Sequence, residues 1–525
     1  MIDTKALREK ILDLAIRGKL VPQDSNDEPT SVLLERIRAQ KQQMVKEGKL
    51  KAKDIKNDTI IFKGEDNLHY EQFQDGTVKC IEDEIPFEVP EGWAWTRLCS
   101  VSYDLPYGTS KKSSTNGKIA VLRMGNLQNG EIDYSDLVYS SDEEDIKKYY
   151  LIRGDLLFNR TNSIELVGKT SVYRGDIPAI YAGYLIRIRS SLNYEYLNAV
   201  MNSSYAREYC TSVRTDAVNQ SNINATKLGH FLIAIPSKSE QKRIGEKISE
   251  SIKVINIIEQ EKLDLQTMAT NVKSKILDLA IRGKLVPQDP NDEPASVLLE
   301  RIRAEKEELI KQGKIKRDKK ESVIFKGEDN SYYEKLPNGK VNCIDEQLPF
   351  ELPDGWKWCN LSMIGTTNIG LTYHPADIDT QGIIVLRSCN IVNDEINLTD
   401  LVHVKTSIRE NQFVKKDDIL ICARNGSCSL VGKCALIPEF DEKVSFGAFM
   451  AVYRTPCFNY IVHFLRSNFF RSVFDDSNST AINQLTQDML KRAVVPLPSL
   501  EEQLRIVDKT TELFKRLNCI EESLS

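Results

Sequence analysis

Apolar side chains recur at steps of three and four residues in several stretches of the chain, which is the pattern of an amphipathic helix. This pattern predicts helices at residues 5–17, from about Pro29 to Gly48, at residues 296–312 and from Glu502 to Ser525. Glycine commonly ends a helix, and Gly18 and Gly48 are placed to end the first two.

The longest helical pattern begins at Glu240 and is ended by Gly283 and Pro287. Its apolar positions form a coiled-coil seam made of Ile244, Ile248, Ile252, Ile255, Ile258, Leu265, Met268, Val272, Ile276 and Leu279. At 1.5 Å per residue, the expected helix is about 60 Å long. A long helix between two folded domains would fix their separation, which a flexible linker could not do.

Shorter apolar runs, separated by glycine and asparagine, predict strands in the segments that flank this helix. In the first segment the pattern predicts strands at Val121–Met124, Asp155–Phe158 and Leu232–Ile235, and a helix from Tyr194 to Cys210. Residues 49–85 are lysine-rich and polar, and they are predicted to be an extended connector without a core.

The chain contains an internal repeat, which dictates its architecture. Lys10–Asp24 recurs unchanged at Lys275–Asp289, and Pro86–Trp95 recurs with few changes at Pro349–Trp358. We call the repeated segments the frame and the two divergent domains between them the inserts. The predicted boundaries are an N-terminal helical region at 1–48, a connector at 49–85, a first insert at 86–239, a central helical region at 240–312, a second connector at 313–348, a second insert at 349–501 and a C-terminal helix at 502–525.

The C-terminal helix stops where the central helix is only half complete, and the N-terminal helix matches the missing half. Laid end to start, the chain forms two equivalent halves of a closed circle. We therefore expect the central helix to pack antiparallel to both terminal helices. The predicted fold class is α+β, with two mixed α/β domains separated by long antiparallel coiled-coil helices in a pseudo-twofold internal repeat.

Composition narrows the class of protein. A net charge of -5 over 525 residues means that any contact with nucleic acid must come from local basic patches. No apolar run reaches the about 18 residues of a membrane span, and the N-terminus lacks the apolar core of a signal peptide. The eleven cysteines are scattered without a metal-type pair, so free thiols in a cytoplasmic protein are expected.

The sequence carries no catalytic motif that we can defend. Gly168-Lys169-Thr170 resembles the end of a phosphate-binding loop, but Ser163 stands where that loop needs its first glycine. The Asn/Asp-Pro-Pro-aromatic tetrapeptide of amino-methyltransferases is absent, and the five histidines form no cluster. A non-catalytic chain without its own cofactor or metal is therefore expected.

Three pairs of segments recur in the same order in both inserts. They are Ile235–Ile244 with Leu497–Ile506, Phe158–Lys169 with Ala423–Lys433, and Asn219-Gln220 with Asn483-Gln484. Together with the frame, they resemble the specificity subunit of type I restriction–modification systems. The resemblance implies that each insert is a target-recognition domain for one half of a bipartite, asymmetric DNA sequence.

The same resemblance implies partners and their cofactors. The helices would set the spacer between the half-sites and dock two methyltransferase subunits, which restriction (translocase) subunits would join. The complex would direct adenine methylation and restriction. S-adenosylmethionine, ATP and Mg²⁺ are expected on the partner subunits and not on this chain.

Arginine, asparagine and glutamine form the paired hydrogen bonds that recognise bases, and lysine binds phosphate. The candidate DNA-binding residues at predicted turns are Lys111, Lys112, Arg123, Asn126, Arg160, Asn162, Asn219 and Gln220 in the first insert, and Arg387, Asn390, Arg424, Asn425, Asn483 and Gln484 in the second. Because several recur in both inserts, a scaffold or phosphate role stays open beside base recognition. Residues of the divergent loops, such as 107–116 and 371–380, are the alternative base contacts.

Two other features favour structural roles. Trp93, Trp95, Trp356 and Trp358 resemble base-stacking platforms, but their repetition within the frame favours packing of the connectors onto the inserts. The acidic run at residues 142–145 is expected to be a solvated helix start that faces away from DNA.

Two further function classes compete with DNA recognition. One is a self-contained nucleic-acid enzyme, which the missing motifs disfavour. The other is a structural coiled-coil scaffold that holds two protein-binding domains, and it predicts no DNA affinity.

Overall fold

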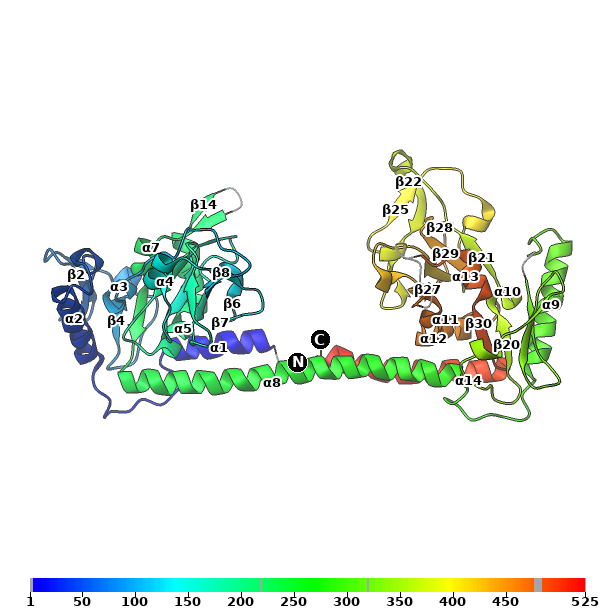
Figure 1. Ribbon diagram of the computed structural model, residues 1–525, viewed down its shortest axis with the longest axis horizontal. Helices are drawn as coiled ribbons and strands as arrows, with labels where there is room; N and C mark the ends of the chain where they lie inside the picture. The colour runs from blue at the N-terminus through cyan, green and yellow to red at the C-terminus, as the bar shows by residue number, and fades with distance from the viewer. Residues whose placement is uncertain (1–2, 218–219, 319–320, 476–483, 525) are drawn as a thin grey trace. The chain divides into compact units, whose positions relative to one another are not determined.

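The protein divides into two compact units, and each of them contains one insert. The computed structural model describes residues 3–217, 220–318, 321–475 and 484–524. The units comprise residues 1–262 and 263–525 (Figure 1). Helix α8 (Lys238–Ile281) begins in the first unit and ends in the second.

The first unit combines a helical N-terminal region with a mixed α/β insert. Its helices are α1 (Thr4–Ile16), α2 (Thr30–Lys46), α3 (Leu98–Val101), α4 (Glu143–Tyr149), α5 (Tyr194–Asn202), α6 (Ser204–Val213) and α7 (Ala225–Gly229), followed by the start of α8. Its strands are β1 (Ile60–Lys63), β2 (His69–Gln72), β3 (Val78–Cys80), β4 (Ala94–Arg97), β5 (Ile119–Leu122), β6 (Leu127–Gln128), β7 (Glu131–Ile132), β8 (Val138–Ser140), β9 (Leu156–Asn159), β10 (Thr161–Asn162), β11 (Thr170–Val172), β12 (Ala179–Tyr181), β13 (Leu185–Ile188), β14 (Thr215–Ala217), β15 (Gln220–Asn222) and β16 (Leu232–Ile235).

The second unit repeats this order after the end of α8. Its helices are α9 (Ala295–Lys311), α10 (Leu361–Ile364), α11 (Phe458–Arg466), α12 (Asn468–Asp475), α13 (Gln487–Arg492) and α14 (Leu500–Leu524). Its strands are β17 (Val323–Lys326), β18 (Tyr332–Lys335), β19 (Val341–Cys343), β20 (Lys357–Asn360), β21 (Thr366–Ile369), β22 (Ile378–Leu386), β23 (Ile391–Val392), β24 (Glu395–Ile396), β25 (Val402–Val404), β26 (Ile419–Cys422), β27 (Cys434–Leu436), β28 (Val444–Phe446), β29 (Met450–Arg454) and β30 (Val494–Leu497).

The two inserts share one sheet topology. In the first, β9 pairs antiparallel with β11 and β13, while β5 pairs parallel with β12 and antiparallel with β8. In the second insert, β26 pairs antiparallel with β27 and β29. Strand β22 pairs parallel with β28 and antiparallel with β25. The three strands that the apolar runs predict in the first insert are confirmed as β5, β9 and β16, and all residues of these strands are buried.

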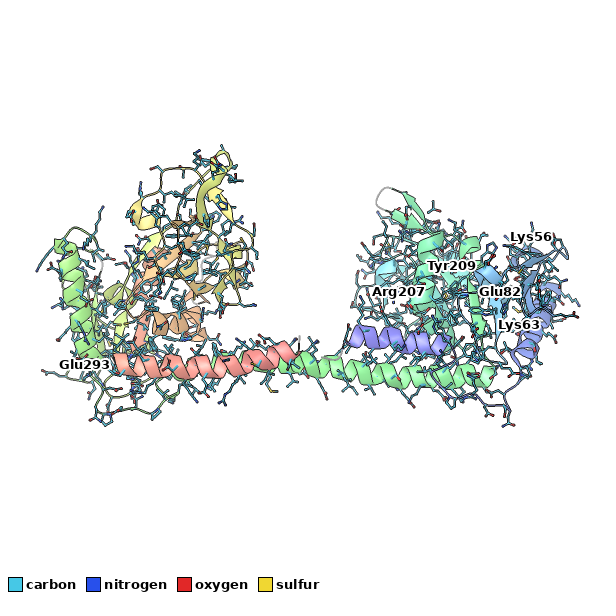
Figure 2. All side chains as sticks on the ribbon, turned by 180° about the vertical axis from the view of Figure 1, so that it is seen from behind. Lys56, Lys63, Glu82, Arg207, Tyr209 and Glu293 are labelled. Atoms are coloured by element: carbon cyan, nitrogen blue, oxygen red, sulfur yellow. The ribbon has the colours of Figure 1, made fainter. Side chains whose placement is uncertain are left out.

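The connectors are folded, so the prediction of an extended segment at 49–85 is wrong. Strands β1, β2 and β3 form a small antiparallel sheet, and β17, β18 and β19 repeat it in the second unit (Figure 1). Ile61 packs with Trp95, and Ile324 packs with Trp358, in one small apolar cluster per unit. Of the polar residues that suggested an extended chain, Lys63 at the end of β1 is exposed, whereas Glu82 follows β3 and accepts from the amide of His69 at 2.7 Å (Figure 2). These contacts confirm the structural role of Trp95 and Trp358.

The single helix predicted from Tyr194 to Cys210 is two helices, α5 and α6. Ser203 between them is in an extended conformation, with φ -69° and ψ 161°. Its hydroxyl donates to the carbonyl of Val200 at 2.7 Å and accepts from the amide of Ala206 at 3.2 Å, which caps α6. A serine side chain that bonds to the backbone on both sides therefore breaks an otherwise continuous helical pattern.

Each terminal helix runs antiparallel to its part of α8, as the repeat order predicts. In the first unit, Arg8 of α1 pairs with Glu259 at 2.9 Å, and Gln23 bonds to Glu240 at 2.6 Å. In the second unit, Lys273 pairs with Glu521 of α14 at 2.6 Å. Gln288, just beyond α8, bonds to Glu502 at 2.7 Å. Residue numbers thus rise on one helix while they fall on its neighbour.

The coiled-coil seam predicted for α8 has a polar gap near Lys262, and the structure interrupts the seam beyond that gap. Ile244, Ile248 and Ile255 are buried near the start of α8, and Ile276 is buried near its end. Leu265, Met268 and Val272, which the seam includes, are instead exposed, with 59% of Met268 accessible to solvent.

A buried glutamate joins α8 to the frame of the first unit. Glu240 is 3% exposed and accepts from Trp93 Nε1 at 3.0 Å and from Gln23 Nε2 at 2.6 Å. Burial raises the pKa of the Glu240 carboxyl, although these two hydrogen bonds oppose the shift. One helix turn further on, Arg243 pairs with Asp27 at 2.7 Å.

The same junction recurs in the second unit. Glu502 is 3% exposed and accepts from Trp356 Nε1 at 2.8 Å and from Gln288 Nε2 at 2.7 Å. Arg505 pairs with Asp292 at 2.6 Å. We call these two sets of contacts the junctions.

A glycine closes each junction, which explains why two distant segments recur together. Gly18 has φ +65°, and a Cβ there would lie 2.4 Å from Pro90. Gly283 has φ +63°, and its Cβ would lie 2.5 Å from Pro353. Both glycines are therefore required by backbone conformation and by close packing.

A buried histidine on α11 makes the second unit sensitive to acid. His463 is 7% exposed, and its ring contacts the ring of Phe514 on α14. Burial lowers the pKa of His463 to about 4, and the nearby charge of Arg466 adds to the effect. Between this value and the ordinary value near 6.5, the unfolded chain binds a proton that the folded chain does not. Stability is therefore full above about pH 6.5 and falls as the pH is lowered towards 4.

The change His463→Leu should remove this part of the pH dependence. We expect the wild-type chain to lose about 2 kcal/mol from this group between pH 7 and pH 5. Urea unfolding of both proteins at the two pH values measures the difference between them. His374→Leu, at an exposed histidine of the same unit, is the control and should keep the wild-type dependence. An unchanged pH dependence in His463→Leu would contradict the assignment.

Candidate nucleic-acid interface

The asparagines predicted to contact DNA after β5 and β22 are buried inside their loops. Asn126 is 3% exposed: its Oδ1 accepts from the amide of Arg123 at 2.8 Å, and its Nδ2 donates to the carbonyls of Asp133 and Asp136 at 2.9 and 2.8 Å. Asn390 is 1% exposed and makes the corresponding three bonds at 2.9, 3.0 and 2.9 Å. These bonds favour the scaffold alternative for Asn126 and Asn390.

The arginines that begin these loops are neutralised. Arg123 pairs with Asp136 at 2.8 Å, and Arg387 pairs with Asp400 at 2.9 Å. Each pair closes the loop that its buried asparagine supports. The geometry therefore assigns Arg123 and Arg387 to the same loop scaffold.

The lysine expected on phosphate is paired within the protein. Lys111 Nζ lies 2.7 Å from Asp142 and 3.6 Å from Asp145. The hydrogen bond to Asp142 raises the pKa of Lys111. Lys112 is exposed.

The acidic run at 142–145 starts helix α4, as the sequence predicts, and Glu143 and Glu144 are exposed, but Asp145 is buried. The side chain of Asp142 caps α4 by accepting from the amide of Asp145 at 2.9 Å. Asp145 is 7% exposed and accepts a hydrogen bond from Thr109. The run therefore holds the loop after β4 and α3 in place.

Arg160, directly after β9, differs from most arginines of the first insert. Seven arginines of that insert pair with carboxylates: Arg97, Arg123, Arg174, Arg187, Arg189, Arg207 and Arg214. Among the described residues, no carboxylate pairs with Arg160. Its guanidinium lies 4.5 Å from the ring centre of Tyr107, and Nη1 lies 3.4 Å from the carbonyl of Gly183. A positive charge thus stays available at the surface, supported by an aromatic face.

Arg424 holds the equivalent position after β26. It is exposed, and within the described parts of the chain it has no carboxylate partner. Its guanidinium lies 5.5 Å from the ring centre of Phe449. The neighbouring Asn425 donates to Ser388 at 3.2 Å, so its amide supports the adjoining loop. Arg424 also forms an isolated antiparallel bridge with Gln484, which is exposed.

A small sheet lies beside Arg160 in the first insert. Strand β15 pairs with β10 and β14, so Asn162 lies opposite Ser221. Asn162 accepts from the amide of Ser163 at 2.8 Å, while Gln220 is exposed. Asn219 and Asn483, which the sequence also indicated, lie outside the described residues.

Two exposed aromatic residues beside these arginines are missing from the sequence-based set. Tyr184 is 54% exposed and Phe449 is 59% exposed, and their carbonyls accept from the amides of Arg160 and Arg424, both at 3.0 Å. The runs Tyr181–Tyr184 and Phe446–Phe449 share an aromatic residue at both ends. Comparing the two inserts with each other would have revealed this signal.

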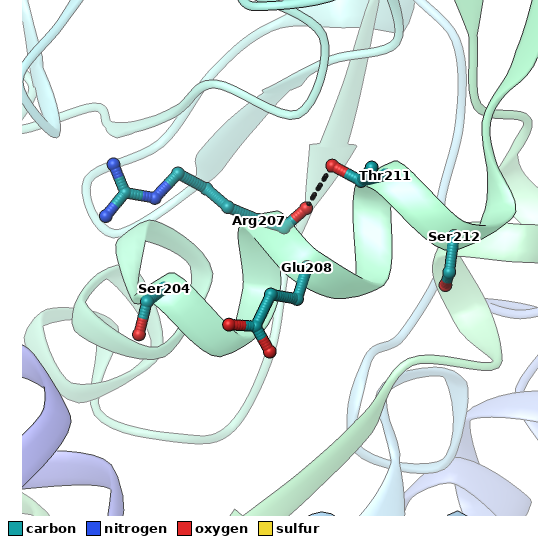
Figure 3. A pocket seen from close by; sticks show the side chains of 5 residues that line it. All are labelled: Ser204, Arg207, Glu208, Thr211 and Ser212. Carbon is teal, nitrogen blue, oxygen red and sulfur yellow. Dashed lines mark hydrogen bonds between the residues drawn. The ribbon is translucent and has the colours of Figure 1, made fainter.

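A hollow in the first insert lies on helix α6. It is shallow and is lined by Ser204, Arg207, Glu208, Thr211 and Ser212, and Thr211 bonds only to the backbone of its own helix (Figure 3). Arg207 pairs with Glu9 of α1 at 2.9 Å. Among the described residues, no three acidic, histidine or cysteine side chains are grouped to hold a metal ion. The described helices also include none with the length and apolarity needed to cross a membrane.

The fold and this surface define a class: two copies of one α/β domain that share a helical frame and each present an unneutralised arginine. The family model of the type I restriction modification DNA specificity domain matches residues 106–267 and 353–524. The two matches cover more than half of the chain, so the chain belongs to the family of type I restriction–modification specificity subunits.

Individual relatives agree with this family over different lengths. The chain is 29% identical to the type I restriction enzyme EcoAI specificity subunit of Escherichia coli over 98% of this chain and 89% of that protein. It is 33% identical to the StySPI specificity subunit of Salmonella potsdam, over 32% of this chain and 38% of that protein. A solved structure described as the basis of complex assembly and conformational transition of the type I R-M system has a similar fold, with a TM-score of 0.54 and 15% identity over 84% of this chain and 94% of that chain.

The changes Arg160→Ala and Arg123→Ala should separate DNA contact from loop scaffold. We expect Arg160→Ala to weaken DNA binding about ten-fold and to lower the salt dependence by about one counterion, with the melting temperature unchanged. Arg123→Ala should lower the melting temperature, because Asp136 loses its partner, and should leave the salt dependence intact. Binding titrations over a range of salt concentrations, together with thermal melts, test both. The opposite pattern would contradict the assignment.

Proposed function

We propose that this chain is the DNA-specificity subunit of a type I restriction–modification complex and that each insert recognises one half of a bipartite, asymmetric DNA target. The single observation that carries the proposal is the pair Arg160 and Arg424. Each follows the central strand of its insert, and neither has a carboxylate partner within the described residues. A charge of this kind is suited to DNA phosphate or to the edge of guanine.

The inserts share the bonds that fold their loops, but they differ in some of the exposed side chains at equivalent positions. The loop bonds of Asn126 recur at Asn390, whereas Tyr107 in the first insert is replaced by Ile369 at the equivalent strand position. Two different surfaces on one scaffold predict two different half-sites. The target is therefore asymmetric.

We further propose that α8 sets the number of unrecognised base pairs between the half-sites. It is one uninterrupted helix of 44 residues, Lys238–Ile281, which begins in one unit and ends in the other. A continuous helix is stiffer than a coil of the same length. The spacing of half-sites on DNA commonly mirrors protein geometry of this kind.

Methyltransferase subunits would dock on exposed apolar residues of the helices, one subunit to each unit of the chain. In the first unit Val254 and Ile257 are both 56% exposed. In the second unit Leu265, Met268 and Val272 are 45%, 59% and 41% exposed. Exposed apolar groups concentrated on one element are typical of a protein interface.

The chemistry of the complex would belong to its other subunits. In this proposal the chain itself is non-catalytic and holds no cofactor. S-adenosylmethionine would be bound by the methyltransferase subunits, and ATP and Mg²⁺ would be used by restriction (translocase) subunits. The chain contributes the choice of site for adenine methylation and for restriction.

A map of modified adenines tests the proposed function. A host that expresses a matched methyltransferase subunit is compared with and without this chain. A split, asymmetric motif that appears only with the chain is the expected result. If the methyltransferase binds the chain but no motif appears, the alternative of a scaffold that holds two protein-binding domains would be favoured.

The change Met268→Lys tests the docking surface. A charge in the apolar contact should reduce the amount of methyltransferase that co-purifies with the chain by up to half, because the surface of the first unit is unchanged. It should leave the melting temperature unchanged because Met268 is exposed. Lys253→Gln, at an exposed polar position of the same helix, is the matched control and should retain both methyltransferase subunits. Full stoichiometry with Met268→Lys would contradict docking at this surface.

A further inference from the structure

Tyr184 and Phe449 occupy the same turn in the two inserts. Tyr184 lies between β12 and β13, and Phe449 lies between β28 and β29. Two hydrogen bonds define the turn in each insert. The amides of Ala182 and Gly447 donate to the last carbonyls of β5 and β22, both at 2.9 Å. The amides of Leu185 and Met450 donate back to the carbonyls of Ala182 and Gly447, at 3.0 and 2.8 Å, and close the turns. Both rings therefore project from equivalent backbone positions.

Folding does not account for an aromatic residue at this position. The rings are 54% and 59% exposed, and neither belongs to the apolar clusters of its insert. The following residues differ between the inserts, since Leu185, Ile186 and Arg187 of β13 occupy the positions that Met450, Ala451 and Val452 occupy in β29. An exposed ring that recurs although its neighbours change is better explained by an interaction than by packing.

Each ring lies beside the unneutralised arginine of its insert. The amides of Arg160 and Arg424 both donate to the carbonyl of the aromatic residue at 3.0 Å. Arg424 contacts the ring of Phe449 itself, at 5.5 Å. In the first insert Arg160 contacts Tyr107 instead, so the ring of Tyr184 is left without this contact.

A second exposed side chain occupies an equivalent strand position in each insert, and in the first insert it contacts Arg160. Tyr107 lies opposite Ile186, and Ile369 lies opposite Ala451, at the equivalent position of the neighbouring segment. Tyr107 is 40% exposed and Ile369 is 50% exposed. Each insert thus presents a positive charge among exposed apolar groups, and the identity of those groups differs between the inserts.

We infer that Tyr184 and Phe449 are specificity-determining residues, each of which packs its ring against the apolar surface of a base in the half-site of its own insert. This inference rests on the proposed function. The arginine attracts the negatively charged DNA backbone. The face of the ring is apolar and donates no hydrogen bond to phosphate, so it is suited to contact a base instead. Aromatic side chains contact nucleic acids through the face of a base or through the methyl group of thymine.

A protein partner is the competing occupant of these rings. Arginine and aromatic residues are also enriched in protein interfaces, but a protein partner would have to bring a carboxylate to each arginine that it buries. Each ring here adjoins an arginine that no carboxylate among the described residues neutralises, which suits a phosphate-bearing partner. The charge therefore favours DNA over a second protein.

The experiment uses the chain assembled with its methyltransferase and DNA duplexes in which one half-site is intact and the other is scrambled. Tyr184→Ala should weaken discrimination for the first half-site on the order of ten-fold and leave the second unchanged. Phe449→Ala should do the reverse. Tyr184→Phe keeps the ring and should behave as the wild type.

Controls separate the ring contact from general effects of an exposed aromatic residue. Phe62→Ala and Phe325→Ala remove rings of similar exposure, 43% and 41%, from the connector sheets and should change neither half-site. Duplexes with uracil in place of thymine distinguish the two kinds of base contact. A loss equal to that of Tyr184→Ala identifies the thymine methyl group, and no loss identifies the face of a base.

The outcomes that overturn the inference are distinct from failure of the proposed function. If the wild-type chain directs no motif, the proposed function and this inference fall together. If the wild-type motif is intact and Tyr184→Ala and Phe449→Ala leave both half-sites unchanged, this inference alone is wrong. Loss of the methyltransferase from the variants, with DNA discrimination unchanged, would assign the rings to a protein partner instead.

Discussion

The bond between a tryptophan and a buried glutamate at the start of a helix determines how each unit is built. Trp93 donates to Glu240 and Trp356 donates to Glu502, at 3.0 and 2.8 Å. Burying a carboxylate that is only 3% exposed costs folding free energy unless hydrogen bonds compensate for the lost water. The tryptophan and the glutamine that donate to it, Gln23 or Gln288, therefore cannot vary independently of the glutamate. The close approach of Gly18 to Pro90 adds a steric requirement to the same junction. These coupled demands account for the near identity of the frame in its two copies.

The inserts are free to differ because the junctions hold only their ends. Strands β4 and β16 pair at the entrance and exit of the first insert, and β20 and β30 do so in the second. Beyond these strands, buried bonds such as those of Asn126 and Asn390 fix the loops from within. In the described part of the chain, the exposed surface around Arg160 and Arg424 is not constrained by such buried hydrogen bonds. Its arginines can be matched with tyrosine in one insert and with isoleucine or phenylalanine in the other.

Much of the fold was predictable because its signals are local. Helical spacing and the glycines at 18, 48 and 283 predict the helix bounds to within about two residues. Short apolar runs between glycine and asparagine turns predict β5, β9 and β16. The connector sheets escaped prediction because their strands are only three or four residues long and lie within lysine-rich, polar sequence. The break at Ser203 escaped because a serine within a helical pattern does not reveal whether its hydroxyl caps a helix.

The candidate interface was less predictable, because a residue type does not reveal what already occupies its side chain. Arg123 and Arg160 are the same residue type, and each follows a buried strand. Arg123 is nevertheless neutralised by Asp136, whereas Arg160 contacts Tyr107. Lys111 was expected on phosphate and is paired with Asp142, thirty-one positions away in sequence. Tyr184 and Phe449 carry no local signal, and only comparison of the two inserts brings them out.

Duplication of one insert is the most direct measurement of whether the inserts are independent recognition domains on a common frame. Residues 349–498 are replaced by residues 86–236, with both junctions kept, and methylated adenines are mapped in a host that expresses the methyltransferase. We predict a symmetric motif made of two inverted copies of the first half-site, with the original second half-site lost. A folded chain that still directs the second half-site, or that binds the methyltransferase and directs no motif, would contradict independent recognition.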